Sequence, residues 1–172
     1  MPELSLRQAT LTDAFVPISD DHGWDVAADL WLYPASAPVS GILVAACALV
    51  LRRRGRAREG TLWLAAWFAG TLIEIVTKHA LERPALFSHG RHVLGFDDSL
   101  PSGHAMRSFL LAAVVASLWA RGRLAWLWAV VVWILLIVEG WHTPTDVLAG
   151  LLLGALLTLT VREFRPSAPA TG

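Results

Sequence analysis

The sequence predicts an all-α integral membrane protein: a helical bundle of about five transmembrane helices, preceded by an amphipathic segment that lies in the membrane interface. Hydrophobic residues make up 55% of the 172 residues and charged residues only 16%, with a mean hydropathy of +0.53. Soluble domains carry about 25% charged residues, so this chain is depleted in charge. A soluble bundle with buried helices is the alternative, and the long unbroken apolar runs disfavour it.

Residues 1–34 form an acidic N-terminal segment, which we treat as a unit of its own. Its six acidic residues face a single basic residue, Arg7. Apolar residues between Trp24 and Trp31 recur at roughly helical spacing, which predicts a short amphipathic helix in the interface. The segment lacks the basic start and apolar core of a signal peptide, so we expect insertion to rely on the internal helices.

Residues 35–166 form the predicted membrane domain, and residues 167–172 are expected to be a disordered tail. Five apolar segments lie within this domain, each close to the roughly 20 residues that cross the hydrocarbon core of a bilayer. Polar breaks, several of them rich in arginine, separate the segments. The expected helices cover residues 37–51, 60–78, 103–120, 124–141 and 145–162.

The placement of arginine sets the expected orientation. With the N-terminus outside, the arginine runs at 52–56, 121–123 and 162–165 all lie on the inner side, as the positive-inside rule requires. The outer side then carries the 79–102 loop and the turn at 140–144. We therefore expect a multi-pass protein of the plasma membrane whose polar clusters face the extracytoplasmic side.

Several classes of protein are excluded or disfavoured by what the sequence lacks. Cys47 is the single cysteine and lies in an apolar segment, which removes disulfides and cysteine-ligated metals from consideration. The sequence contains no glycine-rich nucleotide loop and no basic stripe, so neither a nucleotide cofactor nor a nucleic acid is an expected partner. The lipid bilayer is the partner that the composition does predict.

Residues 101–104 read Pro-Ser-Gly-His and open the third apolar segment. Ser102 is a good N-cap, and the free amides of the first helical turn, together with the helix dipole, form an anion site. Gly103 allows a phosphate to approach the backbone, and His104 is placed to give a proton to a leaving oxygen. An ordinary serine cap beside an interfacial histidine is the structural alternative.

Residues 142–146 read His-Thr-Pro-Thr-Asp and open the last apolar segment. Thr143 is the expected N-cap with Pro144 in the first helical position, and Asp146 is placed to complete a capping box. The capping box explains Asp146 structurally. The functional interpretation, compatible with it, is that Asp146 holds the His142 imidazole and leaves the other ring nitrogen as a nucleophile.

Two basic residues follow the second apolar segment. Lys78 is the only lysine in the chain, and Glu74, one turn before it, is expected either to pair with it or to extend outward. Snorkelling to the headgroups is the alternative for Lys78, and a headgroup contact is the alternative for Arg83. Together with two histidines, these cations make an oxyanion-binding constellation suited to phosphoryl transfer.

This pattern resembles the type 2 phosphatidic acid phosphatase (PAP2) superfamily over about residues 60–160. Pro-Ser-Gly-His at 101–104 matches the second family motif, and His142 with Asp146 matches the His-xxx-Asp half of the third. By this resemblance, His142 is the nucleophile, Asp146 orients it and His104 is the general acid. Lys78, Ser102 and the Gly103 amide hold the phosphoryl oxygens, and the chemistry needs neither a metal nor another cofactor.

The chain departs from the family pattern at two arginines. The first motif has Lys, six residues, then Arg-Pro, and this sequence has Ala85 at the arginine position, with Arg83 two residues earlier. The third motif has an arginine six residues before its histidine, where this sequence has Leu136. We consider Arg83 as a replacement for the first arginine and Arg107, one turn after His104, as a replacement for the second.

The resemblance implies a metal-independent phosphatase that hydrolyses a lipid phosphate or a polyprenyl (di)phosphate through a phosphohistidine. Two alternatives keep the fold. One is a lipid phosphotransferase that passes the phosphoryl group to an acceptor other than water, and the other is a non-catalytic binding protein, which the missing arginines motivate. The sequence indicates neither the oligomeric state nor the exact substrate.

Overall fold

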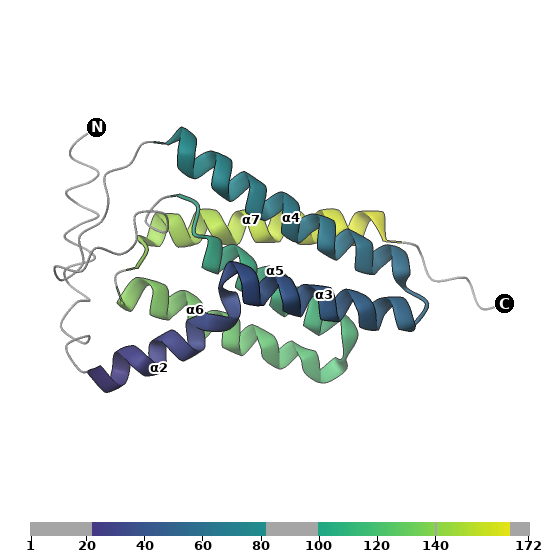
Figure 1. Cartoon of the computed structure of the whole chain (residues 1–172), viewed down its shortest axis with the longest axis horizontal. Helices are drawn as coiled ribbons and strands as arrows, with labels where there is room; N and C mark the ends of the chain where they lie inside the picture. The colour runs from purple at the N-terminus through teal and green to yellow at the C-terminus, as the bar shows by residue number, and fades with distance from the viewer. Residues whose placement is uncertain (1–21, 82–99, 140, 166–172) are drawn as a thin grey trace.

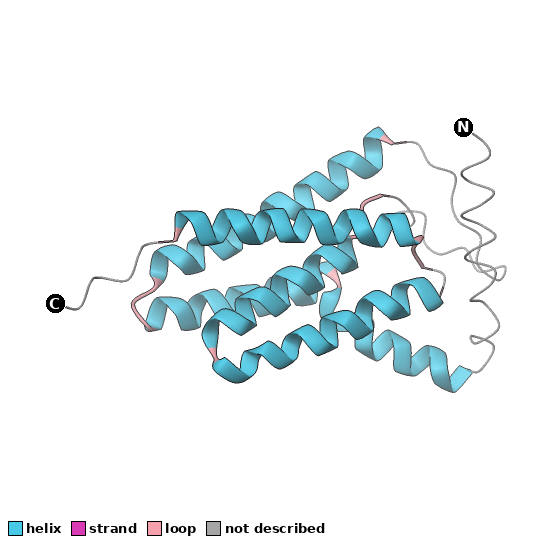
Figure 2. Ribbon diagram, turned by 180° about the vertical axis from the view of Figure 1, so that it is seen from behind, coloured by secondary structure: helices cyan, strands magenta, loops and turns pink. Residues whose placement is uncertain are grey.

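The computed structural model describes residues 22–81, 100–139 and 141–165, and within these ranges it contains helices and no strands (Figures 1 and 2). The prediction of an all-α fold is therefore confirmed. The elements, in chain order, are α2 (His22–Leu32), η2 (Tyr33–Ala35), α3 (Ala37–Arg53), α4 (Ala57–Ala80), α5 (Gly103–Leu118), η3 (Ala120–Leu124), α6 (Ala125–Val138) and α7 (Pro144–Phe164).

Each of the five predicted apolar segments forms a helix, and three or four of the described helical segments meet a criterion of length and composition for crossing a membrane. Three helices of the described part are long and apolar enough to cross a membrane: Ala57–Ala80, Ala120–Val138 and Pro144–Phe164. A fourth span is possible if Ala27–Ala35 and Ala37–Arg53, bent by 53° relative to each other, count as one. Helix α5 is apolar but has only 16 residues. A membrane bundle is supported, and five spans stay a prediction.

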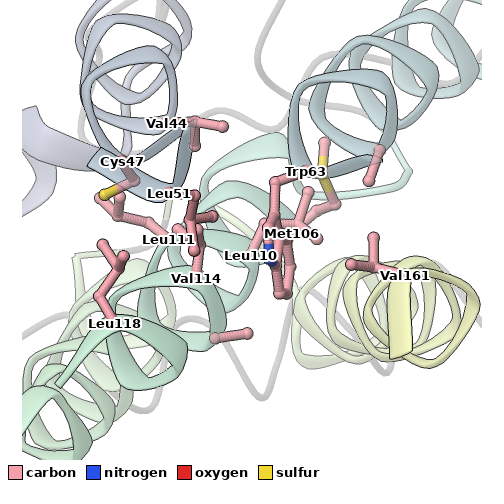
Figure 3. Packing of buried hydrophobic residues seen from close by; sticks show 12 residues of the cluster. Val44, Cys47, Leu51, Trp63, Met106, Leu110, Leu111, Val114, Leu118 and Val161 are labelled. Atoms are coloured by element: carbon pink, nitrogen blue, oxygen red, sulfur yellow. The ribbon is translucent and has the colours of Figure 1, made fainter. Parts of the chain in front are cut away.

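Helix α5 lies at the centre of the bundle and contacts α3, α4, α6 and α7. Its side chains are buried almost all the way round, as expected for a helix that neighbours enclose. Met106, Leu110 and Val114 pack against residues of α3, α4 and α7 in the main apolar core (Figure 3). Because the core is built around α5, the polar residues at the start of this helix are fixed relative to three neighbouring helices.

The N-terminal helix α2 packs on the bundle. Ala28 and Leu32 are buried with Val132 and Leu136 of α6 in a second apolar cluster. The indole Nε1 of Trp128 donates a hydrogen bond to the carbonyl oxygen of Trp31 at 3.1 Å. The described part of the 1–34 segment thus contacts the helical domain, while its boundary as a unit and its location in the membrane interface stay predictions.

Two arginines at one end of the bundle bind the C-terminus of α5. Arg54 Nη1 donates to the carbonyl oxygen of Leu118 at 2.7 Å, and Arg56 Nη1 donates to that of Ser117 at 3.1 Å. The last carbonyls of a helix lack partners within it and carry partial negative charge, so a guanidinium there is stabilising. The arginine-rich turns therefore lie at the end of the bundle opposite the start of α5 (Figure 1).

Candidate active site

The N-terminal ends of α5 and α7 meet at the other end of the bundle. The backbone N–H of Ser102 donates to the carbonyl oxygen of Asp146 at 2.9 Å. Gly150, one turn further along α7, lies so close to α5 that a Cβ there would be 2.3 Å from the carbonyl oxygen of Ser102. The starts of α5 and α7 are thereby brought side by side (Figure 1), and each carries one of the two predicted histidine clusters, 38 positions apart in the sequence.

Ser102 caps α5 as predicted. It has an extended backbone, and its Oγ accepts a hydrogen bond from the N–H of Ala105 at 3.4 Å. His104 follows in the first turn and is buried, with its ring in an edge-on contact with the indole of Trp141 (centroids 6.3 Å apart). Trp141 precedes His142 in the chain, so an aromatic contact links the two clusters.

Thr143 and Asp146 form the predicted capping box at the start of α7. Asp146 Oδ2 accepts from Thr143 Oγ1 at 2.7 Å and from the Thr143 N–H at 3.2 Å, while Thr143 Oγ1 accepts from the Asp146 N–H at 3.3 Å. His142 is fully buried, and its backbone N–H donates to the carbonyl oxygen of Leu136 at 3.0 Å. The capping interpretation of Asp146 is confirmed, and its action on the imidazole stays a proposal.

A buried carboxylate joins the predicted cations of α4 and α5. Glu74 Oε1 lies 2.9 Å from Lys78 Nζ, and Glu74 Oε2 lies 2.5 Å from Arg107 Nη1. The three side chains are only 4–6% exposed. Arg107 also donates from Nε to the carbonyl oxygen of Ala35 at 2.9 Å, which ties α5 to η2. Pairing of Glu74 with Lys78 is therefore confirmed, and the arginine is a partner that sequence reasoning did not find.

Gly103 is required at its position by this carboxylate. A Cβ on Gly103 would lie 1.9 Å from Glu74 Oε1 and 2.3 Å from its Cδ, far inside van der Waals contact. The glycine of the Pro-Ser-Gly-His motif therefore lets Glu74 sit directly against the first turn of α5. The signal available in the sequence was the spacing of Gly103 and Arg107, which puts both on one face of the helix.

The remaining predicted residues divide into two groups. Arg83 and the family arginine position at Ala85 lie outside the described residues. Leu136 is fully buried in the second apolar cluster, so its position carries an apolar side chain packed beside the site. Of the two suggested replacement arginines, Arg107 is the one whose surroundings the structure describes.

An apolar groove of about 290 Å³ opens between α6 and α7 next to the capping box. It begins at Pro144, the first residue of α7, and runs along both helices toward the middle of the bundle. Its walls are formed by Val130, Trp133, Ile134, Ile137, Pro144, Val147, Leu148 and Leu151.

The fold and this end of the bundle define a helical membrane protein with two buried histidines and two buried cations near the start of α5. Residues 75–168 match the PAP2 superfamily; this is more than half of the chain, and the chain belongs to that family. Comparison with curated proteins gives no significant sequence match. Among solved structures, the chain is similar to the first transmembrane PAP2-type phosphatidylglycerolphosphate phosphatase from Bacillus subtilis, with a TM-score of 0.77 and 22% identity, over 95% of this chain and 87% of that one.

These findings support the assignment of this chain to the membrane lipid phosphatases. The matched range contains Lys78 and both histidine motifs, so the family assignment covers every predicted site residue. The likeness in three dimensions extends beyond it to α2 and α3, which belong to the same fold.

Proposed function

We propose that this protein hydrolyses a lipid phosphate or a polyprenyl (di)phosphate at the extracytoplasmic face of the plasma membrane, through a phosphohistidine on His142. The observation that carries the proposal is the junction of the first turns of α5 and α7, which puts His104 and His142 at one end of the bundle. Lys78 lies at the C-terminal end of α4, which points to the same end (Figure 1).

The proposed reaction has two steps. A ring nitrogen of His142 attacks phosphorus, the P–N bond forms, and the bond to the leaving oxygen breaks while His104 gives that oxygen a proton. In the second step His104 takes a proton from water, the water oxygen attacks phosphorus and the P–N bond breaks. Inorganic phosphate leaves, and both histidines return to their starting states.

Asp146 is assigned to the orientation of the nucleophile. One of its oxygens, Oδ2, is already held by the backbone and hydroxyl of Thr143, which fixes the carboxylate relative to His142. We assign the other oxygen to the imidazole, where a carboxylate selects one tautomer and stabilises the charge that the ring acquires. A capping residue and a catalytic partner are then the same side chain.

The negative charge of the phosphoryl group is matched by the backbone and by Lys78. The first turn of α5 presents amides at Gly103 and His104 with the positive end of the helix dipole. Phosphoryl transfer depends mainly on positioning and on stabilisation of charge, so a buried cation beside a helix N-terminus suits it. Ser102 and the Gly103 amide complete the proposed oxyanion contacts.

A lipid substrate is supported by the groove between α6 and α7. The groove is apolar and starts at Pro144, beside Thr143 of the capping box. An amphipathic molecule with its phosphate at the start of α7 would have polar groups around the phosphate, and its chain would lie against the apolar walls of this groove. The arginines at the opposite end of the bundle support an extracytoplasmic site by the positive-inside rule.

The test is release of inorganic phosphate by the detergent-purified protein in EDTA. The substrates are phosphatidic acid, phosphatidylglycerol phosphate, and short- and long-chain prenyl mono- and diphosphates. We expect release from at least one of them and its loss in His142→Ala. His79→Ala is the control, because His79 is an exposed histidine at the end of α4 whose Nδ1 lies 2.7 Å from the Ile75 carbonyl oxygen.

Full activity of a folded His142→Ala variant rejects the nucleophile assignment. Phosphate release that requires an added alcohol acceptor favours the phosphotransferase, since both reactions pass through the same intermediate. Absence of release from the whole panel by folded protein favours a binding role.

A further inference from the structure

The carboxylate of Glu74 lies among groups that we assign to the phosphate. Its Oε1 is 2.9 Å from Lys78 Nζ. The same oxygen is the atom that would lie nearest to a Cβ added to Gly103, at 1.9 Å. Lys78 and Gly103 are both in the proposed phosphate-binding set. A carboxylate oxygen and a phosphoryl oxygen have similar requirements for donors, so Glu74 occupies a position suited to one oxygen of a phosphate.

The three buried side chains do not balance in charge. Lys78 and Arg107 each carry one positive charge, and Glu74 carries one negative charge, which leaves one positive charge in excess among them. Uncompensated charge in a poorly hydrated site is costly, and an anionic ligand relieves it. The two ion pairs therefore hold this cluster together, and its excess positive charge attracts an anion.

Arg107 retains capacity for a ligand. Its Nε binds the Ala35 carbonyl oxygen and its Nη1 binds Glu74, whereas Nη2 makes no hydrogen bond with any residue that the structure describes. A guanidinium fixed at two of its nitrogens loses little further entropy when the third binds an oxyanion. Leu136, at the position of the third-motif arginine, offers no donor from its side chain.

We propose that Arg107 is the second cation of the phosphate site and that Glu74 is its charge-setting and positioning residue. The Glu74 carboxylate lies between Lys78 and Arg107 and holds both cations where a phosphoryl oxygen can contact them. With substrate bound, it aims both cations and limits the affinity for the product phosphate, which must leave. The inference rests on the proposed function, because it concerns the same phosphate.

The two members of the ion pair then have opposite effects on phosphate binding. Glu74→Gln keeps the shape and removes one negative charge beside the bound anion, so the dissociation constant for inorganic phosphate falls by about tenfold or more. Arg107→Met removes a cation of similar length, so the dissociation constant rises by about tenfold or more. A purely structural ion pair would give changes of the same sign, because both variants break the same contact.

The experiment measures the affinity of inorganic phosphate by its stabilisation of the purified protein against thermal unfolding, at several phosphate concentrations. Glu59→Gln is the matched control. Glu59 is a buried glutamate at the other end of α4, paired with Arg56 at 2.7 Å, so it tests loss of the same kind of contact far from the site. The control variant is expected to bind phosphate as the unmodified protein does.

Opposite shifts for Glu74→Gln and Arg107→Met, with Glu59→Gln unchanged, support the proposal. Shifts of the same sign, an equal shift in the control, or no stabilisation of the unmodified protein by phosphate overturn it. If Arg107→Met does not fold, Arg107→Lys carries the test, since lysine keeps the charge but loses the planar fork. We expect it to weaken phosphate binding by about threefold or more, and an unchanged affinity overturns the proposal.

Measuring both the binding of phosphate and the turnover of substrate distinguishes a failure of this inference from a failure of the proposed function. Opposite shifts in protein that releases no phosphate from any substrate would preserve the anion site and reject the phosphatase. Hydrolysis that depends on His142, without opposite shifts, would preserve the phosphatase and reject the role of Glu74 and Arg107.

Discussion

Replacement of Gly103 by alanine tests the contact between α4 and α5 most severely. The added Cβ would lie 1.9 Å from Glu74 Oε1 and 2.4 Å from Oε2, whereas such contacts are essentially never shorter than 3.0 Å. The carboxylate must therefore move by more than 1 Å. We expect a displacement of that size to break its close contacts with Lys78 and Arg107.

The expected cost follows from that loss of charge compensation. Breaking a buried ion pair costs about 3–5 kcal/mol, and alanine recovers up to about 1 kcal/mol of helix propensity. We therefore expect Gly103→Ala to lower the free energy of unfolding by about 3 kcal/mol. Denaturation by SDS in mixed micelles, followed by the fluorescence of the nine tryptophans, measures this change.

A double-mutant cycle identifies the cause. In a Glu74→Ala background the clashing carboxylate is absent, so Gly103→Ala should cost less than about 1 kcal/mol. Gly41→Ala is the control, since the three atoms nearest to a Cβ there all belong to the Trp67 ring, the closest at 3.0 Å. A cost of Gly103→Ala below about 1 kcal/mol, or the same cost with and without Glu74, would refute the assigned contact.

Three further predictions concern other parts of the molecule. Arg54→Met removes the hydrogen bond to the Leu118 carbonyl oxygen and should lower the free energy of unfolding by about 1–3 kcal/mol in the same assay, without changing phosphate release. Thr143→Ala removes the cap that also holds Asp146 and should lower both stability, by about 1 kcal/mol, and kcat, whereas Thr143→Ser should retain both. Leu148→Trp fills the groove between α6 and α7 and should raise KM for long-chain substrates but not for short-chain ones, and equal effects on both would contradict the assignment of the groove.

The local features of the fold were predictable because they depend on residues a few positions apart. Apolar runs between polar breaks indicated each helix from α3 to α7, and the caps at Ser102 and Thr143 followed from side chains that compete for the first free amides. The Glu74–Lys78 pair followed from a spacing of four residues on one helix.

The contacts between distant segments were not predictable in the same way. The pairing of Glu74 with Arg107 depends on how α4 rotates against α5, and the contact of Arg107 with Ala35 depends on how η2 packs beside them. Both are set by the fit of side chains across helix surfaces, which no short pattern contains. The end of α5 was not predictable either, since the apolar run predicted a helix over residues 103–120 and the helix ends at Leu118.

In the candidate site, too, the local motifs were predictable and the contacts between distant segments were not. The two histidine motifs were found from local pattern and family resemblance, and the structure adds that their helices are joined through Ser102 and Asp146. The sequence suggested Arg107, one turn after His104, as the replacement for the arginine absent at Leu136, and that role stays a proposal. The structure adds the buried pair of Arg107 with Glu74, which no local pattern contains.

The most direct measurement of the central claim is capture of the phosphorylated protein. A substrate labelled in its phosphoryl group is mixed with the protein and quenched rapidly, and the label bound to protein is tested for the acid-labile, base-stable behaviour of a phosphoramidate. We expect such label in the unmodified protein and its absence in folded His142→Ala. Phosphate release without any such intermediate, or label that persists in His142→Ala, would contradict the claim that His142 is the nucleophile.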